Sequence, residues 1–119
     1  MKKPDALAAL AALAQDNRLD IFRLLVRAGR DGMAAGNVAS ALKLAPNTLT
    51  FHLDRLREAD LVNVRRQGRS MIYAARYDTM SGLLGFLTEN CCQGNPDECL
   101  PADAVKAARS SARRKEPVA

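Results

Sequence analysis

The spacing of the apolar residues changes partway along this chain, and that change limits the folds it can adopt. Up to Asp60 the apolar residues recur three and four positions apart, which predicts amphipathic helices. From Leu61 to Tyr73 they alternate with polar residues on either side of Gly68, which predicts a β-hairpin. Helical spacing returns over about Asp78 to Glu89. We therefore expect a mainly α-helical fold that carries one β-hairpin.

Four helices are expected before the hairpin, each with an apolar side. The first has Asp5 as its cap and Leu7, Leu10 and Leu13 along one side; the second is capped by Asp16 or Asn17; the third spans about Ala34 to Leu42; the fourth has Pro46 in its first turn and Leu49, Leu53 and Leu56 pointing inward.

A short helix, a tight turn, a helix with a polar outer face and a hairpin with a basic tip follow one another in the order of a winged helix-turn-helix. In such folds the second helix of the pair lies in the DNA major groove, and its first residues contact base edges. The candidates for DNA contact are Pro46, Asn47, Thr48, Thr50, Phe51, His52 and Arg55 on this helix and Arg65, Arg66, Gln67 and Arg69 on the hairpin. Two questions stay open: whether Phe51 is exposed or folded back, and whether His52 is structural or close to DNA.

Charge agrees with a nucleic-acid partner. The formal net charge is +5, and the stretch from Lys43 to Arg76 holds seven basic residues against three acidic ones. There is no apolar stretch of about 18 residues and no convincing signal sequence, so we expect a cytoplasmic protein without a membrane partner. A glycine-rich phosphate loop is missing, as is a histidine near the cysteines, so we do not expect an enzyme. A winged helix that binds protein instead of DNA stays as an alternative.

All three cysteines of the chain, Cys91, Cys92 and Cys99, lie in one short segment near its C-terminus. The residues between the second and the third include Gly, Asn and Pro, which favour a turn that lets the three thiols converge. Three thiolates without an obvious fourth ligand suit trivalent arsenic, As(III), or antimony, Sb(III), better than tetrahedral zinc. Asp97 or Glu98 as a fourth ligand would instead give a zinc, cadmium or lead site, and a disulfide to Cys99 would give a redox switch.

These features divide the chain into three parts. Residues 1–90 are expected to form the winged helix-turn-helix domain for DNA binding and dimerisation, residues 91–100 the thiol segment that binds metalloid, and residues 101–119 a basic tail that is either partly helical or disordered.

Three segments resemble the ArsR/SmtB family of metal-sensing repressors: residues 17–25, residues 50–62, and Arg66-Gln67-Gly68-Arg69 together with Tyr73. The resemblance covers nearly all of residues 5–92, and the ending at Cys91-Cys92 is similar to that of arsenic-responsive members. It implies a homodimer built on the first and last helices, which leaves its double-stranded operator DNA when metalloid binds. Sensor sites of other members look absent, because residues 37–42 contain no cysteine and the last helix has Asp78 but no histidine.

Overall fold

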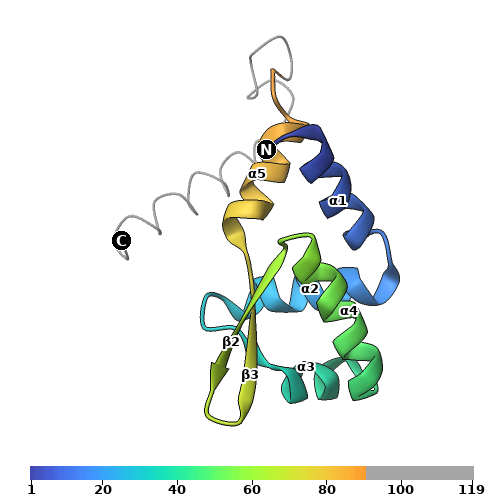
Figure 1. Ribbon diagram of the computed structural model, residues 1–119, viewed down its shortest axis with the longest axis vertical. Coiled ribbons are helices and arrows are strands. Elements are labelled where there is room, and N and C mark those ends of the chain that lie inside the picture. Colours follow the sequence, from blue (N-terminus) through green and yellow to red (C-terminus); the bar gives the residue numbers. More distant parts are fainter. Residues whose placement is uncertain (91–119) are drawn as a thin grey trace. The chain divides into compact units, whose positions relative to one another are not determined.

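The computed structural model describes residues 1–90, of which Met1–Phe86 form one compact unit (Figure 1). Its elements are α1 (Lys3–Leu13), α2 (Asp16–Ala28), β1 (Met33–Ala34), α3 (Ala35–Leu42), α4 (Pro46–Glu58), β2 (Val62–Gln67), β3 (Ser70–Ala75) and α5 (Tyr77–Leu87). This is the mainly helical winged helix-turn-helix that the sequence predicts. Within residues 1–90, no helix is long and apolar enough to cross a membrane.

The core lies where α2, α3 and α4 pack together. Ile21 and Leu25 of α2, Val38 of α3 and Leu53 and Leu56 of α4 are almost completely buried. Burial of one such side chain stabilises a fold by about 1.5–3 kcal/mol. The apolar spacing in α2, α3 and α4 therefore correctly predicted which sides of these helices face inward.

Helix α1 packs differently from the prediction. Its buried residues are Ala6, Ala9 and Ala12, whereas Leu7 is 56% exposed and Leu10 40% exposed. Alanine has no side chain beyond Cβ, so an alanine stripe lets α1 pack close to its neighbours α2 and α4. Leu7 and Leu10 are therefore left on the surface, whereas Leu13 is partly buried against the core.

The helix caps also differ by a few positions from those expected. Asp5 is the third residue of α1, and its carboxylate accepts a hydrogen bond from the backbone N–H of Lys2 at 3.3 Å. Gln15, not Asp16 or Asn17, caps α2, because its side-chain oxygen accepts from the backbone N–H of Arg18 at 2.9 Å. Glutamine is rare at this position of a helix, so the cap was not predicted.

The predicted hairpin is confirmed, but it is part of a three-stranded antiparallel sheet in the order β1-β3-β2. Tyr73 of β3 lies opposite Met33 of β1 on one side and Val64 of β2 on the other. Strand β1 was not predicted, because two residues are too few to show alternation. Gly32 precedes it with φ +73°, and a Cβ at this position would overlap the backbone carbonyl of Tyr73.

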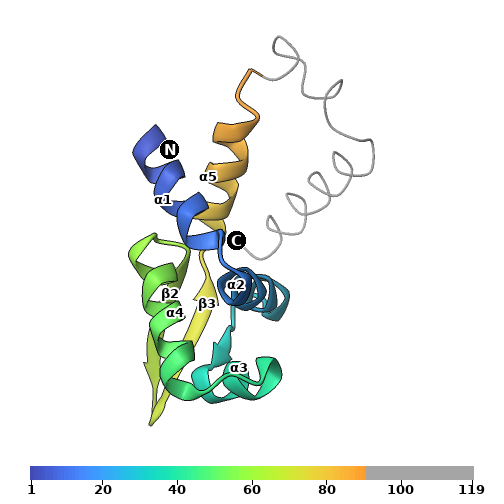
Figure 2. The same cartoon turned by 90° about the vertical axis from the view of Figure 1, so that its right-hand side faces the viewer.

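The start of α5 is anchored to the core. The Tyr77 hydroxyl donates a hydrogen bond to the backbone oxygen of Val26 at 3.0 Å, and Arg76 pairs with Asp78 at 2.9 Å and with Asp60 at 3.5 Å. Both views place α5 beside α1, at the end of the unit opposite the hairpin tip (Figures 1 and 2). Leu83 of α5 is buried, whereas Leu84 is exposed.

Candidate nucleic-acid interface

Helix α4 has one side in the core and one side on the surface. Pro46 is its first residue, where the missing N–H costs no hydrogen bond. Its inward residues are Leu49, His52, Leu53 and Leu56, and its exposed residues include Pro46, Asn47, Thr48, Thr50, Phe51 and Arg55. Figure 2 shows α4 and the hairpin along one side of the unit, with α2 and α3 along the other side.

Polar groups at the start of α4 differ in their freedom to bind a ligand. The Thr50 hydroxyl donates to the backbone oxygen of Pro46 at 2.9 Å, so its proton is already used inside the helix. Asn47 and Thr48 have no side-chain hydrogen bond among the described residues. Their donors and acceptors are therefore available to base edges or phosphates.

Phe51 is 55% exposed, which answers one of the questions that the sequence left open. The Arg55 guanidinium lies over its ring, with Cζ 5.3 Å from the ring centroid. Arg55 also pairs with Glu58 at 3.0 Å, one turn further along α4. In the chain without DNA, Arg55 is thus held by an aromatic ring and a carboxylate.

His52 is the one predicted DNA contact that the structure places in the core, and this corrects its assignment to the interface. The residue is 7% exposed, and its pKa is lowered, chiefly by burial and secondly by the positive charge of Arg18. Both His52 Nδ1 and Arg18 Nε are buried without a hydrogen-bond partner. The lowered pKa favours the neutral imidazole near pH 7, and the side chain packs inside the unit. Nothing in the sequence indicated that Arg18 lies near it.

The basic residues at the tip of the hairpin are all exposed, as predicted. The guanidinium groups of Arg65 and Arg66 donate to backbone oxygens, that of Arg65 to Asp31 at 2.8 Å and that of Arg66 to Gly68 at 3.1 Å. These bonds use one donor of each group and leave others for phosphates. Gln67 and Arg69 are exposed and have no side-chain partner among the described residues.

The predicted metalloid ligands Cys91, Cys92 and Cys99 lie outside the described residues, as do residues 101–119. Within residues 1–90, no group of three or more His, Cys, Asp or Glu side chains is arranged to hold a metal ion.

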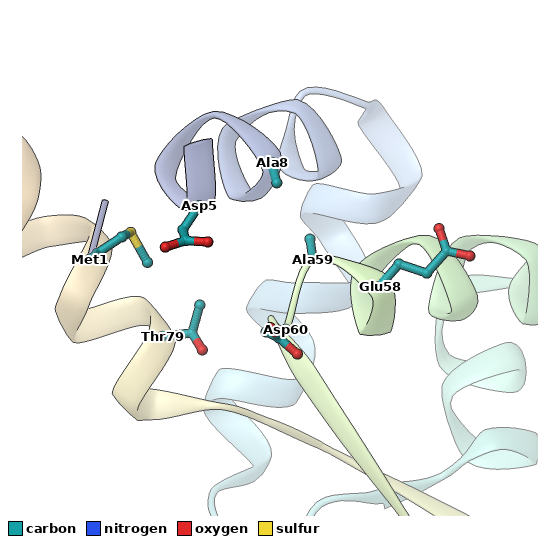
Figure 3. A pocket seen from close by; sticks show the side chains of 7 residues that line it. All are labelled: Met1, Asp5, Ala8, Glu58, Ala59, Asp60 and Thr79. Carbon is teal, nitrogen blue, oxygen red and sulfur yellow. The ribbon is translucent and has the colours of Figure 1, made fainter. Parts of the chain in front are cut away.

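A hollow of about 290 Å³ lies beside α1, the end of α4 and α5 (Figure 3). Asp5, Glu58 and Asp60 line it together with Met1, Ala8, Ala59 and Thr79. Figure 3 shows the three carboxylates spread around the hollow, not converging on one point. Glu58 and Asp60 are engaged by Arg55 and Arg76, respectively, so this acidic hollow has no cation-binding geometry.

Comparison with known proteins identifies the class. The family model described as a helix-turn-helix domain matches residues 13–65. The transcriptional regulator YceK of Bacillus subtilis is 34% identical over 77 residues, which cover 64% of this chain and 76% of YceK. The nodulation protein NolR of Rhizobium meliloti is 34% identical over 80 residues, which cover 67% of this chain and 63% of NolR.

A solved structure agrees with the fold. The homodimeric winged helix-turn-helix DNA-binding domain from Mycobacterium bovis has a TM-score of 0.60 at 24% identity, and the match covers 73% of this chain and 81% of that one. The chain therefore belongs to the helix-turn-helix transcriptional regulators, and its fold is that of the winged type.

Proposed function

We propose that this chain is an operator-binding repressor of the ArsR type, whose two copies each place α4 in the DNA major groove. One observation supports this most strongly. The outward side of α4 has Asn47 and Thr48 with unused hydrogen-bonding groups, and the basic hairpin tip lies on the same side of the unit. Base edges would be read from α4, and phosphates would be held by Arg65, Arg66 and Arg69.

A homodimer through α1 and α5 belongs to this proposal. Leu7 and Leu10 of α1 are exposed, and α5 lies beside α1 with Leu84 exposed as well. A leucine side that the chain does not bury by itself is the kind of surface that a second copy covers. Two-fold symmetry would then set two α4 helices against two half-sites of one operator.

The inducer that we propose is As(III) or Sb(III), bound by Cys91, Cys92 and Cys99. Support comes from the thiol chemistry of this segment and from the absence of any other cluster of potential metal ligands within residues 1–90. A metalloid that binds the DNA-incompetent dimer more tightly than the competent one would release the operator. The coupling free energy in typical allosteric pairs is about 1–3 kcal/mol.

DNA recognition is tested by anisotropy titration of a labelled promoter duplex from upstream of the protein's own coding sequence. Asn47→Ala should weaken binding to this duplex by about 1–3 kcal/mol per half-site and leave binding to unrelated DNA nearly unchanged. Asn63→Ala, in an exposed position at the start of β2, is the matched control. Equal affinity of wild type and Asn47→Ala for the promoter would refute the placement of α4.

Thiol ligation is tested without DNA. The reduced chain has three cysteines. A chromogenic thiol reagent should therefore detect three thiols without arsenite and none when arsenite is bound. Three thiols that stay fully reactive at saturating arsenite would exclude this ligand set. If zinc or cadmium, but not arsenite, protects the thiols from the reagent, the chain is a divalent-metal sensor. If peroxide oxidises the thiols and also releases the DNA, the chain is a redox switch.

A further inference from the structure

Helix α4 exposes one large apolar side chain in an otherwise polar surface. Phe51 is 55% exposed, whereas the other large apolar residues of α4, Leu49, Leu53 and Leu56, are buried. Residues four apart on a helix share one side, so Asn47, Phe51 and Arg55 form a single line along α4. Phe51 therefore stands between the residue best placed for base contact and a residue suited to phosphate.

The ring is held in place before any ligand arrives. Its centroid lies 5.5 Å from that of His52, at an interplanar angle of 67°, in an edge-to-face contact. The Arg55 guanidinium lies over the ring, 5.3 Å from its centroid, and pairs with Glu58 at 3.0 Å. Because His52 is buried in the core, it gives the ring a rigid support. Little side-chain entropy then remains to be lost when Phe51 meets a partner.

The chemistry of the major groove indicates which DNA group Phe51 can contact. A phenyl ring has no hydrogen-bond donor or acceptor. Against a carbonyl, amino or ring-nitrogen edge of a base, it would displace water without replacing the lost hydrogen bond. The apolar group that standard base pairs present in this groove is the C5-methyl of thymine. A fixed, exposed ring on the reading side of α4 matches that methyl group.

We propose that Phe51 contacts the C5-methyl group of a thymine and that the operator therefore requires a thymine at this position. This inference rests on the proposed binding of operator DNA by α4 and names the base feature that α4 reads. His52 acts here as a positioning residue, since it touches the ring and not the DNA.

The experiment removes the methyl group from the DNA and the ring from the protein. Thymines of the promoter duplex are replaced one at a time by deoxyuridine, which keeps every hydrogen-bonding group, and affinities are measured by anisotropy at low ionic strength. Wild type should bind about fourfold more weakly when one particular thymine, or its symmetry mate, lacks its methyl group. Phe51→Ala should bind the thymine and deoxyuridine forms of that site equally.

A matched control separates this effect from a general loss of apolar surface. Met71→Ala removes an exposed apolar side chain from β3 and should keep the wild-type discrimination. Wild type that is indifferent to deoxyuridine at every thymine, or Phe51→Ala that discriminates as wild type does, would overturn this inference and leave operator binding intact. Failure of wild type to bind the unmodified duplex would overturn the proposed function and this inference together.

Discussion

His52 links the stability of this fold to pH. Its pKa lies below the ordinary value of 6.5, first because burial disfavours the charged ring and second because Arg18 is positively charged. Between the folded and unfolded pKa values the unfolded chain binds more protons, so stability rises with pH in that interval. The contribution is complete above about pH 6.5 and is lost as pH falls towards the lower, folded pKa.

Urea unfolding at several pH values tests this role. The free energy of unfolding of wild type should decrease more between about pH 7.5 and pH 5.5 than that of His52→Gln, which has no group that titrates there. Asp78→Asn is the control, because the pKa of Asp78 is lowered from 3.8, mainly by its hydrogen bond from Arg76, and the carboxylate does not titrate in this range. Parallel curves for wild type and His52→Gln would show that the imidazole is not held neutral by the fold.

Strand β1 can form beside β3 because of a single glycine. Gly32 has φ +73° and approaches the backbone of Tyr73, whereas Gly68 has φ +65° with open space around it, and Gly36 in α3 has open space as well. Added methyl groups at these three positions should therefore change the free energy of unfolding to different extents.

Thermal or urea unfolding of three glycine-to-alanine variants measures that gradation. Gly68→Ala should cost about 1–2 kcal/mol, from the left-handed backbone alone. Gly32→Ala should cost more, because the new Cβ also displaces β3, and Gly36→Ala should be neutral or stabilising by up to about 1 kcal/mol. A Gly32→Ala variant as stable as Gly68→Ala would show that β1 does not pack against Tyr73 as described.

The hairpin is proposed to bind phosphates, which makes a prediction about salt. Arg69→Gln should weaken binding to operator and unrelated DNA alike and reduce the slope of log affinity against log salt by about 2, because each of the two subunits loses one phosphate contact. Lys3→Gln makes the same change of charge in α1, at the opposite end of the unit, and should leave the slope unchanged. Equal slopes for wild type and Arg69→Gln would remove the hairpin tip from the interface.

At the scale of the whole molecule, the exposed leucines of α1 predict assembly. Leu7→Asp should convert a homodimer to a monomer in sedimentation, and operator affinity should fall because two half-sites are no longer bound together. The fold should persist, since the side chain is on the surface. Leu19→Asp, at an exposed position of α2, should leave the dimer intact. A dimeric Leu7→Asp variant would place the interface elsewhere.

Much of this architecture could be predicted from the sequence, for reasons visible in particular residues. The spacing of Leu49, Leu53 and Leu56 predicted the inward side of α4, and alternation around Gly68 predicted the hairpin. The leucine spacing of α1 predicted the wrong buried side. Alanine contributes little to an apolar pattern, yet it is the residue that allows close packing. The burial of His52 depends on long-range packing, and its lowered pKa depends also on Arg18; no local pattern reveals either.

The candidate interface was predictable in outline but not in its internal contacts. The sequence predicts polar residues at the start of α4 and arginines around the hairpin turn. The Thr50 bond to Pro46 and the Arg65 bond to Asp31, by contrast, follow from three-dimensional placement. These contacts determine which donors are free, so they change which residues are expected to read bases.

The most direct measurement is release of the protein from its promoter duplex by effector, followed by anisotropy under reducing conditions. Arsenite or antimonite should release wild type, whereas Cys91→Ser, Cys92→Ser and Cys99→Ser should bind the duplex with wild-type affinity and stay bound. Release should weaken as pH falls, because the ligands are thiolates. A complex of wild type that persists at saturating arsenite and antimonite, or a triple serine variant that is released as wild type is, would contradict the account.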